Sequence, residues 1–86
     1  MFVVYVLFSP SANRTYVGFT NNLPRRFKEH NLPNSRTSTA RFGPWAIIHS
    51  EVLNSRLEAR KREKQLKSGV GRKWIKEYIF PNFFRE

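Results

Sequence analysis

The 86-residue sequence contains no cysteine and no aspartate, and its six acidic residues are all glutamates. The absence of cysteine excludes a disulfide framework, a thiolate zinc site and a cysteine nucleophile. The longest apolar run, residues 2–8, is far shorter than the about 20 residues that span a bilayer, and no basic segment precedes it as in a secretory signal. We therefore expect a cytoplasmic protein without a membrane partner.

The composition predicts one small folded domain, residues 1–86, with a strongly basic surface. Hydrophobic residues make up 40% of the chain and aromatic residues 15%, which is enough for a dense core and too much for a disordered chain. Sixteen lysines and arginines give a net charge of +10. Nucleic acid is the partner that this charge favours, ahead of a merely solvated basic face or an anionic membrane.

The cations gather in the C-terminal half of the chain and in one polar segment. Residues 31–44 have no periodic pattern and form a long loop for so small a domain, which is typical of functional segments. The second region is the basic stretch from residue 56 to residue 76. We expect nucleic-acid contacts from both regions, made by Arg36, Arg41, Arg60, Lys61, Lys64, Lys67, Arg72 and Lys73.

Apolar and turn-forming segments alternate in a way that predicts an α+β domain with the element order ββαβαα. Residues 2–8 are continuously apolar, which is typical of a central strand covered on both faces, and residues 14–20 predict its hairpin partner. Pro24 suits the start of a helix that runs to about His30. Residues 45–53 predict the third strand.

Two further helices are predicted after the third strand. Ser55 and Glu58 form a capping box, which marks the start of a helix that we expect to end at Gly69. A short last helix, about residues 71–80, should end before Pro81.

Glu63 is an acid in the middle of an apolar stripe on the first of these helices. Ala59, Leu66 and Val70 are spaced so that they share one face with it. An isolated carboxylate directed inward is costly, so Glu63 must find a cation. That cation is either the side chain of Lys67 or of an arginine, or it is a bound divalent metal ion, and the spacing leaves both open.

Other polar side chains lie where they could form a site. Arg26 and His30 are four residues apart and share a helix face, where a guanidinium could bind phosphate, although the spacing alone favours a solvated face. Tyr5 and Tyr16 lie on the two hairpin strands, and the strand register decides whether they share a face. Gly18 within the second strand indicates that another group approaches the backbone closely.

Four short motifs occur in order along the chain. They are Val3-Val4-Tyr5, Tyr16-Val17-Gly18, Leu23-x-x-Arg26-x-x-x-His30 and Ala59-x-x-x-Glu63-x-x-Leu66-Lys67. Together they resemble the motifs of the GIY-YIG nuclease family, especially its small stand-alone URI-type branch and the N-terminal domain of the UvrC excision-repair nuclease. The resemblance covers residues 2 to about 76, and it departs at Val3 and Val4, where the family has glycine and isoleucine.

The resemblance implies a three-stranded antiparallel sheet flanked by helices, with Tyr5, Tyr16, Arg26, His30 and Glu63 on one face of the sheet. Glu63 would bind one Mg²⁺ or Mn²⁺ ion. Arg26 would stabilise the charge developing on phosphorus. One tyrosine, with Tyr5 favoured, would orient or deprotonate the attacking water, and Tyr16 and His30 would support it or assist the leaving group. Because a free tyrosine titrates at about 10, a tyrosine base requires cations that lower its pKa.

The implied function is a divalent-metal-dependent DNA endonuclease that acts in DNA repair or recombination. One small domain leaves no room for a second DNA-binding domain, so we expect selection of branched or damaged DNA by structure, target choice by a partner protein, and weak activity in isolation. The first alternative is a non-catalytic nucleic-acid-binding module with the same fold. The second is a small RNA-binding protein, which would give Glu63 no role.

Overall fold

The computed structural model describes residues 1–31 and 43–83 of the chain. Its elements are β1 (Phe2–Ser9), β2 (Arg14–Thr20), α1 (Leu23–Asn31), β3 (Ala46–Leu53), α2 (Arg56–Lys67), α3 (Gly69–Trp74), the π-helical segment η2 (Ile75–Ile79) and α4 (Phe80–Phe83). The predicted α+β class and the order ββαβαα are confirmed. Within the described ranges, no helix has the length and apolar character needed to cross a membrane.

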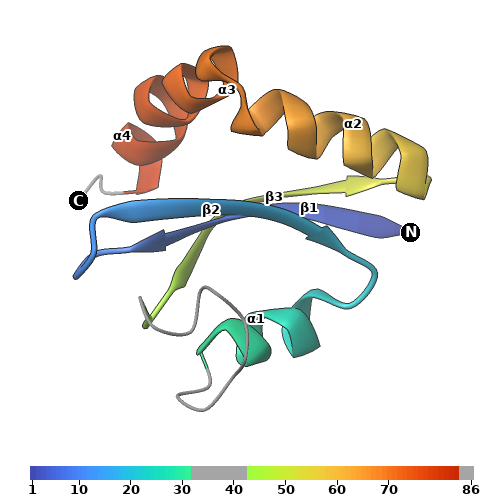
Figure 1. The fold of residues 1–86 in the computed structure, drawn as a ribbon, viewed down its shortest axis with the longest axis horizontal. Coiled ribbons are helices and arrows are strands. Elements are labelled where there is room, and N and C mark those ends of the chain that lie inside the picture. The colour runs from blue at the N-terminus through green and yellow to red at the C-terminus, as the bar shows by residue number, and fades with distance from the viewer. Residues whose placement is uncertain (32–42, 84–86) are drawn as a thin grey trace.

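The three strands form one antiparallel sheet in the order β2-β1-β3. Every residue of β1 from Val4 to Ser9 is buried, which confirms the prediction of a central strand covered on both faces. Figure 1 shows the cause: α1 covers one face of the sheet, and α2, α3 and α4 cover the other. The edge strand β2 therefore lies between two helical layers.

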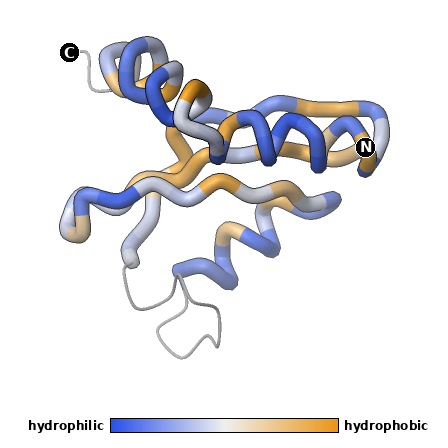
Figure 2. The backbone as a smooth tube through the Cα atoms, turned by 45° about the horizontal axis from the view of Figure 1, so that its top comes forward, coloured by the Kyte–Doolittle hydropathy of each residue, from blue (hydrophilic) through white to orange (hydrophobic). Residues whose placement is uncertain are grey.

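Each face of the sheet has its own apolar core, because successive side chains of a strand point to opposite faces. The cluster on the α2 face consists of Val4, Val6, Val17, Ala59, Leu66, Ile75 and Ile79. The cluster on the α1 face consists of Tyr5, Leu7 and Trp45, with Tyr16, Leu23, Phe27 and Ile47 packed against it. In Figure 2 the hydrophobic stretches run along the strands, whereas α2 is largely hydrophilic.

Asparagine side chains fix both ends of α1. Asn22 Oδ1 accepts a hydrogen bond from the backbone N–H of Arg25 at 3.2 Å, which caps the first turn. At the other end, Asn31 Oδ1 accepts from Trp45 N at 2.6 Å, and Asn31 Nδ2 donates to Trp45 O at 3.2 Å. These two hydrogen bonds tie the end of α1 to the residue before β3 and hold the helix against the sheet.

The start of α2 agrees with the sequence, but its end does not. Ser55 is the N-cap, and its side chain accepts from Glu58 N. The helix ends at Lys67 rather than Gly69, because Ser68 is its C-cap. Ser68 is also the N-cap of α3, where its side chain accepts a hydrogen bond from Gly71 N. This break turns Val70 away from the predicted stripe, so Ala59 and Leu66 are buried while Val70 is 80% exposed.

Pro81 was predicted to follow the last helix, but it lies inside α4. Its ring has no N–H to donate and would clash with the carbonyl four residues earlier in a regular α-helix. The turn before it is the π-helix η2, in which Phe80 N bonds to Ile75 O. The wider turn relieves that clash and lets the chain remain helical through Phe83.

Candidate active site

The hairpin register places both tyrosines on the α1 face of the sheet. Tyr5 lies opposite Gly18 and Tyr16 lies opposite Leu7, so the two tyrosines are diagonal neighbours. Their ring centroids are 6.3 Å apart. A Cβ atom on Gly18 would lie only 2.6 Å from Tyr5 Oη, which explains the glycine in this strand as the sequence predicts.

Replacing Gly18 by alanine should therefore destabilise the fold by about 1–3 kcal/mol, because overpacking a filled core forces its neighbours to shift. The side chain that must move is Tyr5, so its contacts in the site should change as well. Urea denaturation measures the free energy of unfolding. Gly69→Ala is the control, since a Cβ there meets nothing within 4 Å and should not destabilise.

Helix α1 brings His30 and Arg26 to the tyrosines. Tyr5 Oη and His30 Nε2 are hydrogen-bonded at 3.0 Å, and each of the two residues is only 1% exposed. The ring of Tyr16 lies 4.9 Å from that of His30 and is partly exposed. Arg26 lowers the pKa of Tyr5 in part, and it pairs with Glu29 at 3.5 Å, with 36% of its side chain exposed. Of these four side chains, only Tyr16 and Arg26 are open to solvent.

Burial dominates the electrostatics of the two inner groups. It raises the pKa of Tyr5 to about 12, with Tyr16 adding to the rise, and Arg26 only partly opposes it. Burial, together with the charge of Arg26, lowers the pKa of His30 below its usual value. Tyr5 is thus a protonated phenol beside a neutral imidazole at pH 7. The lowered pKa that a tyrosine base requires is not found at Tyr5.

Glu63 reaches this site from the other helical layer. It lies on α2, which covers the opposite face, so the expectation that all five residues share one face is wrong for Glu63. Because β2 is an edge strand, no further strand separates the side chains of α2 from the tyrosines at that edge of the sheet. Lys67 Nζ lies 6.0 Å from the Tyr16 ring centroid and 3.6 Å from Glu63 Oε2, and the charge of Glu63 contributes to the raised pKa of Tyr5.

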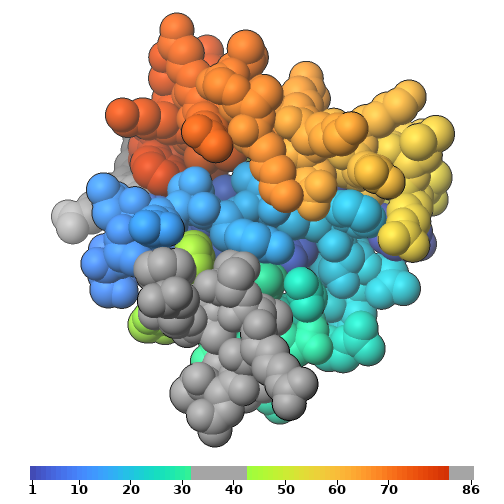
Figure 3. Space-filling view, viewed as in Figure 1, coloured from blue at the N-terminus to red at the C-terminus, as the bar shows by residue number. Residues whose placement is uncertain are grey.

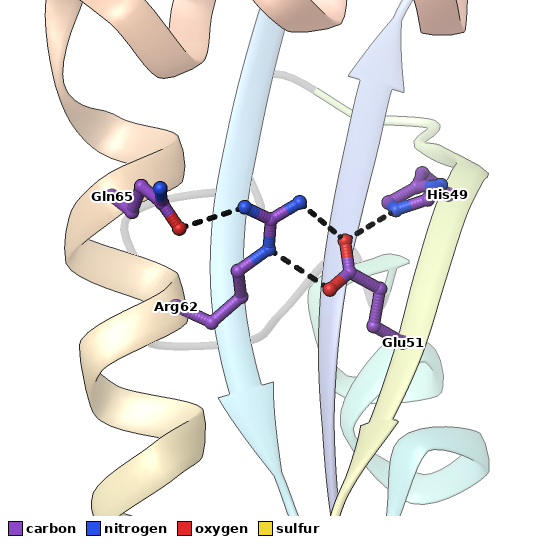
Figure 4. Close-up of polar contacts among 4 residues, drawn as sticks. All are labelled: His49, Glu51, Arg62 and Gln65. Carbon is purple, nitrogen blue, oxygen red and sulfur yellow. Dashed lines mark hydrogen bonds and ion pairs between the residues drawn. The ribbon is translucent and has the colours of Figure 1, made fainter.

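A network that the sequence does not reveal fixes the rotation of α2 about its axis (Figure 4). Arg62 donates two hydrogen bonds of 2.9 Å to the carboxylate of Glu51 on β3, and a third of 2.8 Å to Gln65. His49, whose partner could not be read from the sequence, bonds Glu51 at 2.7 Å. Arg62 and, after it, His49 lower the pKa of Glu51 against the effect of burial. The next residue, Glu63, pairs with Lys67, whose Nζ lies 6.0 Å from the ring of Tyr16 on β2.

The sequence model described as the GIY-YIG catalytic domain matches residues 1–78. The chain belongs to the GIY-YIG nuclease family. The resemblance seen in the four motifs is thereby confirmed. No solved structure matches the chain.

Relatives of this GIY-YIG domain include proteins of similar and of much greater length. A structure-specific endonuclease subunit SLX1 homolog from Giardia intestinalis is 43% identical over 42 residues, which are 46% of this chain and 12% of that protein. A UPF0213 protein from Natronomonas pharaonis is 35% identical over 65 residues, 76% of this chain and 75% of that one. A UPF0213 protein from Bacillus velezensis is 33% identical, with 78% and 67% covered.

The residues of this GIY-YIG domain fit a metal site with a single protein ligand. Within the described ranges, no three histidine or acidic side chains come together, so Glu63 would be the single protein ligand. Its side chain is 18% exposed and its only described ion pair is the contact with Lys67 at 3.6 Å, so one carboxylate oxygen can exchange that partner for a metal ion. Mg²⁺ and Mn²⁺ tolerate such a site, because water and phosphate oxygens complete their coordination.

Most cations predicted to contact nucleic acid are on the surface. The exposed ones are Arg60, Lys61, Lys64, Lys67, Arg72 and Lys73. Lys67 and Lys73 pair with glutamates four residues away, and the lysine side chains are 50% and 76% exposed, so both lysines remain accessible to a phosphate. The predicted contacts of Arg36 and Arg41 lie outside the described residues.

Proposed function

We propose that this GIY-YIG domain is a metal-dependent DNA endonuclease that hydrolyses phosphodiester bonds and selects DNA by structure. The observation that carries the proposal is the buried pair of Tyr5 and His30 with the Tyr16 ring 4.9 Å from His30, beside Lys67, which lies 6.0 Å from the Tyr16 ring and pairs with Glu63 at 3.6 Å. The family match and the name of the Giardia relative support it. A role in DNA repair or recombination, with a partner protein that chooses the target, belongs to the same proposal.

Arg26 and Tyr16 are the groups that would touch the substrate. A guanidinium can donate two parallel hydrogen bonds to a phosphate, and its interaction strengthens as negative charge develops in the transition state. The hydroxyl of Tyr16 would orient the attacking water, since its ring is the more exposed of the two tyrosines. These assignments follow from exposure: a phosphate of DNA reaches a partly open side chain before it reaches a buried one.

Tyr5 and His30 are proposed to position the outer groups. A phenol with a pKa of about 12 keeps its proton at pH 7, so Tyr5 donates to His30 Nε2 rather than acting as a base. The same hydroxyl interacts with Arg26, which raises the pKa of Arg26 although burial acts in the opposite direction. Tyr5 and His30 therefore place a neutral, hydrogen-bonded pair beside the guanidinium, and the partly exposed Glu29 at 3.5 Å is the acid that a phosphate would replace.

Glu63 is proposed to hold one Mg²⁺ or Mn²⁺ ion. The bound ion would supply Lewis-acid stabilisation of the phosphate charge and a more acidic bound water. In its absence Lys67 neutralises the carboxylate at 3.6 Å, so the site carries no uncompensated charge. The same contact favours the alternative function, a module that binds nucleic acid without cutting it, in which Glu63 only pairs with Lys67.

A nicking assay separates the two functions. Labelled single-stranded, duplex and branched DNA are incubated with the protein in Mg²⁺, in Mn²⁺ and in EDTA. The proposal expects cuts that require the metal and that are strongest on branched DNA. Binding to all three DNAs without any metal-dependent cut would support the non-catalytic module instead.

Binding to DNA should depend steeply on salt, whichever function holds. If about five exposed cations contact phosphates, the slope of log affinity against log salt concentration should be about −4.5 for duplex DNA, because each contact releases counterions. Fluorescence anisotropy with labelled duplex between low and physiological salt measures this slope. A slope near zero would exclude the nucleic-acid partner altogether.

A further inference from the structure

Two neighbouring hollows on the surface share lining residues, and one of them is lined by Tyr16 of the active site. The first is lined by Thr15, Tyr16, Val17, Leu66, Lys67, Arg72 and Ile75. The second has a volume of about 260 Å³ and is lined by Phe8, Asn13, Thr15, Arg72, Ile75, Lys76 and Phe80. The two share Thr15, Arg72 and Ile75. Figure 3 shows this boundary, where α2 and α3 meet the hairpin and β2.

The second hollow has an apolar floor and a basic rim. Ile75 and Phe8 are buried beneath it, and Phe80, partly exposed, packs edge-on against Phe8 at 5.2 Å between centroids. Arg72 and Lys76 are both exposed and four residues apart, so they stand side by side on the rim. Neither forms an ion pair with an acid in the part of the chain that the structure describes.

We propose that this second hollow binds one unpaired nucleotide of a DNA strand whose neighbouring phosphate lies in the active site. The inference rests on the proposed nuclease function and names its substrate class. The base would pack on the apolar floor, and the phosphate would lie between Arg72 and Lys76. An apolar surface beside cations that follow the backbone is the usual way in which single strands are bound.

The form of the bound strand decides whether a base can reach the hollow. Its volume of about 260 Å³ is close to the lower end of the range of about 300–1,000 Å³ typical of sites for small organic ligands, the size class of a single base. In a duplex the bases are stacked inside and cannot enter the hollow. The preferred substrate is therefore a DNA in which single strand begins at the cut, such as a flap, a splayed end or a branch point.

The inference is tested with two DNAs of equal length, one fully paired and one with a single-stranded arm. Affinity is measured in EDTA and nicking is measured in Mg²⁺. The variant Arg72→Ala/Lys76→Ala is compared with Arg60→Ala/Lys61→Ala, which removes the same charge from exposed residues that line neither hollow. A third DNA carries an abasic site in the arm beside the junction.

Wild-type protein should bind the armed DNA about tenfold more tightly than the duplex, since one stacked base contributes about that factor. The Arg72/Lys76 variant and the abasic DNA should both lose this preference, whereas the Arg60/Lys61 variant should bind both DNAs equally more weakly and keep the preference.

An Arg72/Lys76 variant with an unchanged preference would overturn the inference. If the preference holds in EDTA but no DNA is cut in Mg²⁺, the hollow is supported and the nuclease function fails. Equal binding and cutting of both DNAs would refute the hollow and leave the nuclease standing.

Discussion

Replacing Arg26 by alanine should lower the rate of DNA cleavage by about two to three orders of magnitude, the usual effect of removing one preorganised donor to transition-state charge. Stability and DNA affinity should change little. The only ion pair of Arg26 in the described residues is with Glu29 at 3.5 Å, with the two side chains 36% and 39% exposed, and such pairs contribute little. Single-turnover nicking, thermal melting and binding in EDTA measure the three quantities on one preparation.

Arg25→Ala is the matched control, because Arg25 is the next residue of α1, carries the same charge and is exposed. It should lose some affinity and keep the cleavage rate of the bound complex. Arg26→Lys should rescue little, since an ammonium cannot make the forked contact of a guanidinium. Normal cutting by Arg26→Ala would make Arg26 a surface charge and remove α1 from the mechanism.

The local features of the fold could be predicted from the sequence because each depends on a few neighbouring residues. The apolar run of β1, the serine cap of α2 and the proline at the start of α1 are such features. The close approach at Gly18 belongs here too, although the partner, Tyr5 Oη, could be named only from the structure. Helix ends were harder, because Ser68 ends one helix and begins the next in a single residue.

Contacts between particular residues of different elements could not be predicted from the residue pattern alone. The strand register decides that Tyr5 and Tyr16 share a face, and sequence alone allows the slip that would separate them. The bidentate pair of Arg62 with Glu51 joins residues eleven positions apart on different elements, and nothing in the pattern selects that cation from its neighbours. The sequence does not show that Tyr5 is buried. Burial raises the pKa of Tyr5 and keeps it a protonated phenol, so the proposed role of orienting the attacking water is given to Tyr16 instead.

The charge of Glu63 distinguishes an enzyme from a binding module. Glu63→Gln keeps the shape of the side chain and removes its charge, so we expect the cleavage rate to fall by about a hundredfold or more, because a metal ion supplies several kcal/mol to the transition state. The metal concentration needed for half-maximal rate should rise as well. DNA binding in EDTA should be equal or tighter, since one negative charge leaves a basic surface.

The stability of the same variant decides how the result is interpreted. The pair with Lys67 is 3.6 Å long, and the lysine side chain is 50% exposed, so its loss should cost at most about 0.5 kcal/mol. Glu77→Gln is the control, because Glu77 also pairs with a lysine four residues away, Lys73 at 3.9 Å, and lines neither hollow. Both variants should melt close to the parent, and only Glu63→Gln should stop cutting. A Glu63→Gln protein that melts early and still cuts at the parental rate would show that the carboxylate serves only the helix, and the case for a metal at this site would be lost.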